Sequence, residues 1–208
     1  MVLTSDIKIL AKMKKAKRGT LFFTNDFIAF GKPDAIRQAL QRLVKSGEID
    51  RLAAGIFVRP AKDDLIGKVM PDIEDVAKAI ARRDRARIVP TGDYALNRLG
   101  LSTQVPMNIV YLTDGTARKI KIGNYTIVFK KVAPKNVAAI GEVSRLVIQA
   151  LKTIGSQNIT EKEILHVQTV LQSEKPTHLE YDIRLVPAWI QEIMKPSLKK
   201  IKNEDSIK

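Results

Sequence analysis

The sequence predicts an α+β protein, in which an N-terminal winged helix-turn-helix is followed by a mixed domain with a small antiparallel sheet and C-terminal helices. Three observations lead to this prediction. A short basic helix stands directly before a two-stranded ribbon in KPDAIRQALQRLVKSGEIDRLAAGIFVRP, residues 32–60. Strand-like runs between residues 107 and 132 are punctuated by DG and GN, which are strong hairpin signals. From about Gly141 onward, the apolar residues recur with a helical period.

The first 60 residues contain the short elements of a winged helix-turn-helix. A first helix is expected to run to about residue 16, followed by TLFF as a short strand and TNDFIAFG as a short helix. Pro33 suits the first turn of the next helix, and Gly47 suits its C-terminal cap. EIDRL and GIFVR then flank AAG as a hairpin. A helix followed directly by a ribbon is how a winged helix-turn-helix presents itself to DNA.

The helix expected over residues 33–46 separates apolar from polar side chains. At 100° per residue, its apolar stripe consists of Ile36, Leu40, Leu43 and Val44. In a helix-turn-helix the N-terminal half of the second helix enters the major groove. That geometry nominates three side chains for base contacts: Arg37, Gln38 and Gln41. Glutamine pairs bidentately with adenine and arginine with guanine, so these are suitable residue types.

Four further basic residues are candidates for contacts with the DNA backbone. Arg42 and Lys45 lie farther along the same helix, and Lys32 lies in the turn before it. Arg51 lies in the ribbon, and Gly55 allows the tip of the ribbon to turn tightly. Such contacts hold the protein in register on the duplex without reading its sequence.

The boundary between the two domains is expected in PAKDDLIGKVMP, which two prolines bracket. We therefore predict a winged helix-turn-helix over residues 1–60, a linker over 61–71 and an α+β domain over 72–196. A disordered tail is expected over residues 197–208, at the end of the sequence.

The charge of the chain favours a polyanionic partner. Lysine and arginine number 36 against 22 acidic residues, a net charge of +14, and residues 1–60 hold half of it with 12 basic and 5 acidic side chains. Nucleic acid or an anionic membrane surface would suit this charge. The apolar runs are too short to span a membrane. Without a signal peptide pattern or any cysteine, the chain is expected in the cytoplasm.

Motifs of common enzyme classes are missing from the sequence, and we expect no catalytic residue, metal or cofactor. The acidic clusters, including Glu74 and Asp75, open predicted helices, where carboxylates favour the positive end of the helix dipole. The two histidines, His166 and His178, fall on different predicted elements. The C-terminal aromatic and aliphatic residues at helical spacing are expected in the core of the last helices: Tyr181, Leu185 and Trp189.

Residues 26–60, DFIAFGKPDAIRQALQRLVKSGEIDRLAAGIFVRP, resemble the N-terminal winged helix of abortive-infection antitoxins of the AbiEi type. That family includes shorter relatives described as transcriptional regulators. The resemblance continues over residues 88–132, IVPTGDYALNRLGLSTQVPMNIVYLTDGTARKIKIGNYTIVFKKV. It covers residues 1 to about 135 well and the helical remainder loosely.

This resemblance implies a type IV toxin–antitoxin system. The winged helix would bind double-stranded DNA at operator repeats and repress the operon, and two copies would suit an inverted repeat. The functional partner would be a nucleotidyltransferase-like toxin, neutralised through the C-terminal domain without a stable complex. The implied DNA contacts fall on the seven residues already nominated: Lys32, Arg37, Gln38, Gln41, Arg42, Lys45 and Arg51.

Three other functions stay open on the sequence. The chain could be a transcriptional regulator without a toxin, an RNA-binding protein, or a nucleic-acid enzyme that uses Glu74 or Asp75 with Mg²⁺. The basic strands around residues 118–131 also allow two interpretations. Their lysines and arginine either protect a sheet edge from aggregation or form a second phosphate-binding surface: Arg118, Lys119, Lys121, Lys130 and Lys131.

Overall fold

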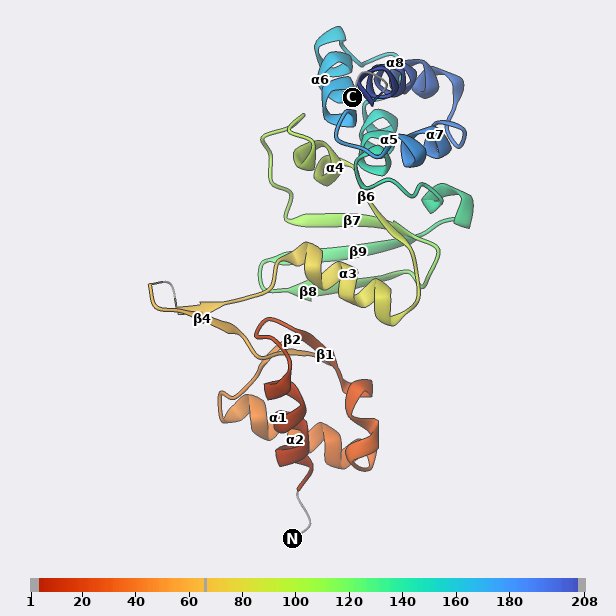
Figure 1. Cartoon of the computed structure of the whole chain (residues 1–208). Coiled ribbons are helices and arrows are strands. Elements are labelled where there is room, and N and C mark those ends of the chain that lie inside the picture. Colours follow the sequence, from red (N-terminus) through yellow and green to blue (C-terminus); the bar gives the residue numbers. More distant parts are fainter. Residues whose placement is uncertain (1–3, 66, 206–208) are drawn as a thin grey trace. The chain divides into compact units, whose positions relative to one another are not determined.

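The structure of the chain, a computed structural model, describes residues 4–65 and 67–205 and has an α+β fold (Figure 1). The chain divides into two compact units. The first consists of the described residues up to Ile80 together with residues 120–124, and the second of residues 81–119 and 125 onward. Each unit has its own hydrophobic core. No helix among the described residues is both long and apolar enough to cross a membrane.

The first unit alternates short helices with short strands. Its elements are α1 (Ser5–Lys15), β1 (Leu21–Phe23), the 3₁₀ helix η1 (Thr24–Phe30), α2 (Pro33–Lys45), β2 (Asp50–Ala53), β3 (Ile56–Val58), β4 (Ala61–Asp63), β5 (Gly67–Val69) and most of α3 (Ile73–Arg83). An antiparallel sheet has the order β1-β3-β2, in which Leu21 lies opposite Val58 and Arg51 opposite Phe57. The short strand before residue 24 and the hairpin around Gly55 are as predicted.

A single core joins α1, η1 and α2 in the first unit. Ile9 and Met13 of α1 are fully buried with Phe27 of η1 and with Ile36 and Leu40 of α2. Residues four apart lie above one another on one face of an α-helix, so α1 and α2 each present such a pair to the core. Burial of each large apolar side chain contributes roughly 1.5–3 kcal/mol. This packing fixes which side of α2 faces water.

The segment expected as a linker, residues 61–71, is largely a β-hairpin. β4 and β5 pair antiparallel, with Ala61 opposite Val69 and Asp63 opposite Gly67. The ammonium of Lys68 lies 2.9 Å from a carboxylate oxygen of Asp50 and connects the hairpin to β2. Strands of three residues are too short to show the alternation by which strands are recognised in a sequence.

The second unit combines a sheet with a bundle of helices. Its elements are the end of α3, β6 (Ile88–Thr91), α4 (Asp93–Arg98), β7 (Asn108–Thr113), β8 (Arg118–Ile122), β9 (Tyr125–Lys131), η2 (Pro134–Val137), α5 (Glu142–Ile154), α6 (Glu161–Leu171), α7 (Pro176–Ile183) and α8 (Ala188–Asp205). β6 was not predicted, and it contains Pro90. A proline is tolerated there because β6 is an edge strand.

The sheet is mixed and not antiparallel as predicted. Its order is β6-β7-β9-β8, and β9 runs parallel to β7, with Ile109 opposite Ile127 and Tyr111 opposite Phe129. β8 and β9 are neighbours joined by the predicted turn at Gly123. β9 therefore lies between β7 and β8. The predicted turn at Asp114-Gly115 consequently does not join two paired strands. Four residues reach about 13 Å, enough to cross the roughly 10 Å that two strand spacings require.

The helices of the second unit bury a common core. Val147 and Leu151 of α5 are fully buried with Leu171 of α6 and with Leu179 of α7, and Figure 1 shows α5 to α8 gathered together. Thr160 caps the start of α6, because the Glu163 backbone N–H donates to the Thr160 hydroxyl at 3.3 Å.

Two predictions about the C-terminal helices are wrong. α8 continues to Asp205 and buries Ser197 and Ile201, so no disordered tail begins at residue 197; residues 206–208 lie outside the described residues. Tyr181 and Leu185, expected in the core, are 45% and 42% exposed. Helical spacing alone did not show which side of α7 meets its neighbours.

Two buried carboxylates hold the N-terminus of α5. The Asp182 oxygens accept hydrogen bonds from the backbone N–H groups of Ile140 at 2.8 Å and Gly141 at 2.9 Å. A Glu174 oxygen accepts from the backbone N–H groups of Val143 at 2.8 Å and Ser144 at 3.1 Å. These bonds satisfy N–H groups that a helix start leaves free, and the negative charges suit the positive end of the dipole.

We expect Asp182→Asn to destabilise the second unit by about 1–3 kcal/mol, because one buried acceptor becomes a donor that faces a backbone N–H. Urea unfolding followed by Trp189 fluorescence would measure the loss, since Trp189 is the only tryptophan and packs against this core. Glu192→Gln is the matched control, because Glu192 is exposed on α8. Equal unfolding midpoints for the two variants would contradict the role given to Asp182.

Candidate nucleic-acid interface

α2 is the element on which the predicted DNA contacts depend. It begins at Pro33, whose fixed φ suits the first helical position. Its end is defined by the Ser46 backbone N–H, which donates to the Arg42 carbonyl at 2.8 Å, and by Gly47 with a φ of +75°. The buried face consists of Ile36, Ala39, Leu40 and Leu43. The predicted stripe is thus confirmed except that Ala39 takes the buried place given to the half-buried Val44.

The opposite face of α2 is exposed to solvent. The turn before it and its outer face present four polar side chains that have no hydrogen bond or ion pair within the described part of the chain: Lys32, Gln38, Gln41 and Lys45. Gln38 and Gln41 are three residues apart and therefore neighbours on the helix surface. The structure brings these four residues together on one helix and its entry turn.

Arg37 lies on the same exposed face but pairs within the helix. Its guanidinium contacts the carboxylate of Asp34, one turn earlier, and both side chains are exposed. Exposed pairs of this kind contribute little to stability. The contact therefore positions Arg37 without removing it from solvent.

Arg42 has a partner that the helical wheel could not show. Its guanidinium makes two hydrogen bonds of 2.7 Å to the carboxylate of Asp6 on α1. This contact with Arg42 lowers the pKa of Asp6 and raises the pKa of Arg42. Two helices that share a core are thereby also joined at the surface. Arg42 was predicted to contact the DNA backbone, whereas in the structure its charge is paired with Asp6.

The β2–β3 hairpin carries Arg51 next to α2 in the sequence. Arg51 is exposed, and its Nε donates to the Ala53 carbonyl of the same hairpin at 3.3 Å. The tip turns at Gly55, which has a φ of +71°. The Gly55 carbonyl accepts a hydrogen bond from the Thr24 backbone N–H at 3.1 Å, which ties the hairpin to η1. The hairpin is therefore held in place relative to the helices of the first unit.

Some basic residues of the first unit are structural, and others were not assigned a role from the sequence. Arg18 and Arg59 donate to the carbonyls of Pro60 and Ala16, each at 3.1 Å, and tie the end of α1 to the end of the sheet. Three exposed lysines follow the buried Met13: Lys14, Lys15 and Lys17. The sequence shows this run of positive charge, but it does not show on which side of the fold the lysines lie.

The basic residues of strands β8 and β9 lie in different environments. Arg118 contacts the carboxylate of Asp84 and lies over the ring of Phe129, with 5.4 Å between the guanidinium and the ring centre. Burial and the neighbouring Arg83 lower the pKa of Arg118. The four lysines expected with it are exposed: Lys119, Lys121, Lys130 and Lys131. Lysines on the edge strand β8 suit protection of that edge.

The acidic residues considered for metal binding have local roles. Glu74 pairs with Lys78 at 2.7 Å, and its backbone N–H donates to the Asp72 carboxylate at 2.9 Å. Within residues 4–65 and 67–205, no group of three or more potential ligands is placed to hold a metal ion. His166 lies with its Nε2 2.6 Å from the Leu99 carbonyl and connects α6 to the end of α4.

We expect Arg42→Gln to raise the pKa of Asp6 toward its ordinary value of 3.8. Because the folded pKa is lowered, the pair stabilises the protein above about pH 4 and loses this effect as the pH falls through the folded pKa. An NMR titration of the aspartate carboxyl carbons would measure the change. Lys45→Gln removes a charge from the same helix and serves as the control. An Asp6 pKa that is unchanged by Arg42→Gln would rule out the pair in solution.

The comparison with known families identifies a group without an assigned function. Residues 8–179 match the family described as "Family of unknown function (DUF6088)". Because this match covers most of the chain, the chain belongs to that family. No curated protein matches the sequence.

Proposed function

We propose that this DUF6088 protein is a winged helix-turn-helix protein of the cytoplasm that binds double-stranded operator DNA and represses its own operon. The observation that carries the proposal is the outer face of α2. There, the buried face orients Gln38 and Gln41 to solvent without partners, between unpaired lysines at the two ends. The resemblance to AbiEi-type antitoxins supports the more specific proposal that the operon also encodes a nucleotidyltransferase-like toxin. The protein would act by binding, not by catalysis.

The two glutamines are suited to reading bases in the major groove. A carboxamide offers one donor and one acceptor group, which match the N7 and N6 positions of adenine. Gln38 and Gln41 lie in the first two-thirds of α2 and project from one side of it. Arg37 would join them at a guanine once it is released from Asp34. These contacts would give sequence preference but only part of the affinity.

The lysines at the ends of α2 are suited to phosphates. Lys45 lies thirteen positions after Lys32, which is about 20 Å along a helix axis. The major groove is about 12 Å wide, so a helix lying in it places its two ends near the flanking phosphates. The free N–H groups and positive dipole at the start of α2 would add to the contact from Lys32. Arg51 on the hairpin would reach the adjacent backbone.

Arg42 would support binding indirectly. Its bond to Asp6 holds α1 against α2, so it would keep the helix in position more than contact DNA itself. This differs from the contact inferred from the helical wheel. Salt dependence distinguishes the two roles, since only a direct phosphate contact releases counterions.

We expect Gln41→Ala to relax base preference at one or two operator positions, whereas Lys45→Ala should weaken binding to all sequences alike. Lys45→Ala should also lower the slope of log K against log salt by about 1. Fluorescence anisotropy on operator and scrambled duplexes at several salt concentrations measures both effects. Lys195→Ala on α8 makes the same change in net charge and should leave the slope unchanged. Equal losses on both duplexes for Gln41→Ala would contradict base reading by α2.

Repression itself is tested with the DNA upstream of the protein's own gene. We expect binding that survives competition by unrelated DNA at physiological salt, together with lower expression of a reporter placed behind that DNA. Binding that competitor and salt abolish together would contradict operator recognition. Tighter binding to tRNA than to this DNA under the same conditions would favour an RNA-binding protein.

The antitoxin role needs a separate test, because it is linked to the second unit. Co-expression with a neighbouring toxin gene should restore growth, and the double variant Gln38→Ala/Gln41→Ala should lose repression while still restoring growth. Loss of both activities in this variant would contradict separate roles for the two units. An operon without such a toxin would leave a transcriptional regulator.

A further inference from the structure

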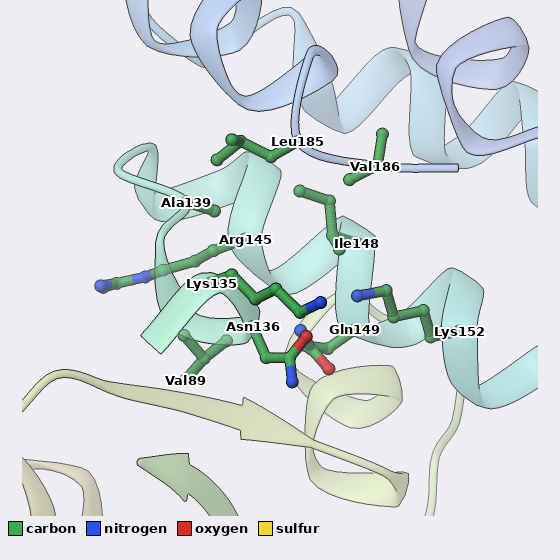
Figure 2. Close-up of a pocket in the computed structure, with 10 residues that line it drawn as sticks. All are labelled: Val89, Lys135, Asn136, Ala139, Arg145, Ile148, Gln149, Lys152, Leu185 and Val186. Carbon is green, nitrogen blue, oxygen red and sulfur yellow. The ribbon is translucent and has the colours of Figure 1, made fainter. Parts of the chain in front are cut away.

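A pocket in the second unit has an unusual combination of side chains. Figure 2 shows it between η2 and the middle of α5, with Val89, Ile148 and Val186 as its apolar part. Its empty volume is about 280 Å³, including space open to solvent. A hollow that opens to solvent and is lined by charged side chains suits a small polar group more than a large apolar ligand.

The polar part of this pocket is positively charged. Figure 2 shows the ammonium ends of Lys135 and Lys152 pointing toward one another over the carboxamides of Asn136 and Gln149. The lining includes no carboxylate. Neither lysine forms an ion pair within the described residues, and burial lowers the pKa of Lys152. Two cations directed toward one another repel unless an anion lies between them.

Arg145, the third cation of the lining, is engaged differently. Its guanidinium lies 3.8 Å from Glu142 on the same helix, and Figure 2 shows it pointing away from the two lysines. Glu142 is itself 86% exposed. Glu142 is therefore paired with Arg145 outside the pocket and does not neutralise Lys135 or Lys152.

Gln149 provides an independent indication of a ligand. The residue is only 4% exposed, and its carboxamide has no hydrogen-bond partner in the described chain. The carboxamide lies in the pocket beside the lysine ends (Figure 2). Buried polar side chains nearly always have a partner, so one without a partner in a pocket indicates a site for a bound group.

We propose that this pocket binds a phosphoryl group. Two ammonium groups and two carboxamides offer donors from several directions, which suits a tetrahedral oxyanion better than a planar carboxylate. The charge of a phosphate monoester, about −1.5 to −2 at neutral pH, balances the two lysines. Because the pocket opens to solvent, the phosphoryl group can lie between the lysine ends while the rest of its bearer remains outside. The source is either a small phosphate compound or the terminal phosphate of a nucleic acid.

The site is independent of DNA binding by α2, because its residues all belong to the second unit. Failure of operator binding would leave it unaffected. Conversely, loss of the phosphoryl site should not alter the base preference of α2.

The first experiment titrates inorganic phosphate into the full-length protein at constant ionic strength, with NMR detection of the Gln149 side-chain amide. We expect a saturable shift of this resonance. Lys135→Gln and Lys152→Gln should each weaken phosphate binding at least tenfold, because each removes one cation from the pocket. Both lysines are exposed, so these variants should fold. Lys195→Gln, which makes the same charge change on α8, should bind phosphate like the unmodified protein.

Two further arms define the ligand. Acetate at the same concentrations should bind at least tenfold more weakly, and equal binding would overturn the assignment to a phosphoryl group. A short single-stranded oligonucleotide is compared with and without a 5′-phosphate. Binding that needs both this phosphate and Lys152 identifies a nucleic-acid end, whereas binding of inorganic phosphate alone identifies a small compound. The proposal is overturned if phosphate does not shift Gln149, or if neither lysine variant weakens binding.

Discussion

The burial of one face of α2 is the constraint on which the candidate interface depends. Ile36, Leu40 and Leu43 enter the core formed with α1 and η1, and the cost of exposing them fixes the rotation of the helix. Every polar side chain on the opposite face is consequently held toward solvent. α2 need not be stable as an isolated helix, because the packing of its apolar face supplies most of its stability. The same core positions the hairpin through the bond between Thr24 and Gly55.

A comparable constraint acts on α5 in the second unit. Asp182 and Glu174 hold its first turn, and Gly141 must lack a side chain there. A Cβ at residue 141 would lie 2.2 Å from the Ser144 hydroxyl and 2.5 Å from a Glu174 oxygen. With its start held in this way, α5 directs Gln149 and Lys152 to the side facing η2. The buried carboxylates therefore fix the start of α5. Farther along the helix, the positive charges of Lys152 and of Lys135 on η2 have no ion pair within the described residues.

Ion pairs divide the basic residues of the chain into two groups. Arg42 and Arg118 face acids on other elements, Asp6 and Asp84 respectively. Arginine suits such a role, because its planar group can bond a carboxylate with two donors at once. Most of the lysines considered for nucleic acid remain exposed, and Lys45 is one of them. Much of the net charge that points to a polyanion therefore remains accessible after folding.

The sequence by itself determined the elements whose pattern is local. The apolar repeat of α2 and the glycine turns at Gly55 and Gly123 were predicted correctly, because each depends on residues within a turn or two. So was the exposure of Gln38, Gln41 and Lys45, which follows from the helix period. Only the tertiary structure decided the parallel pairing of β9 with β7, the continuation of α8, the partner of Arg42 and the pocket around Gln149. These depend on residues far apart in the chain, and helix or strand periodicity carries no information about which distant partner each face meets.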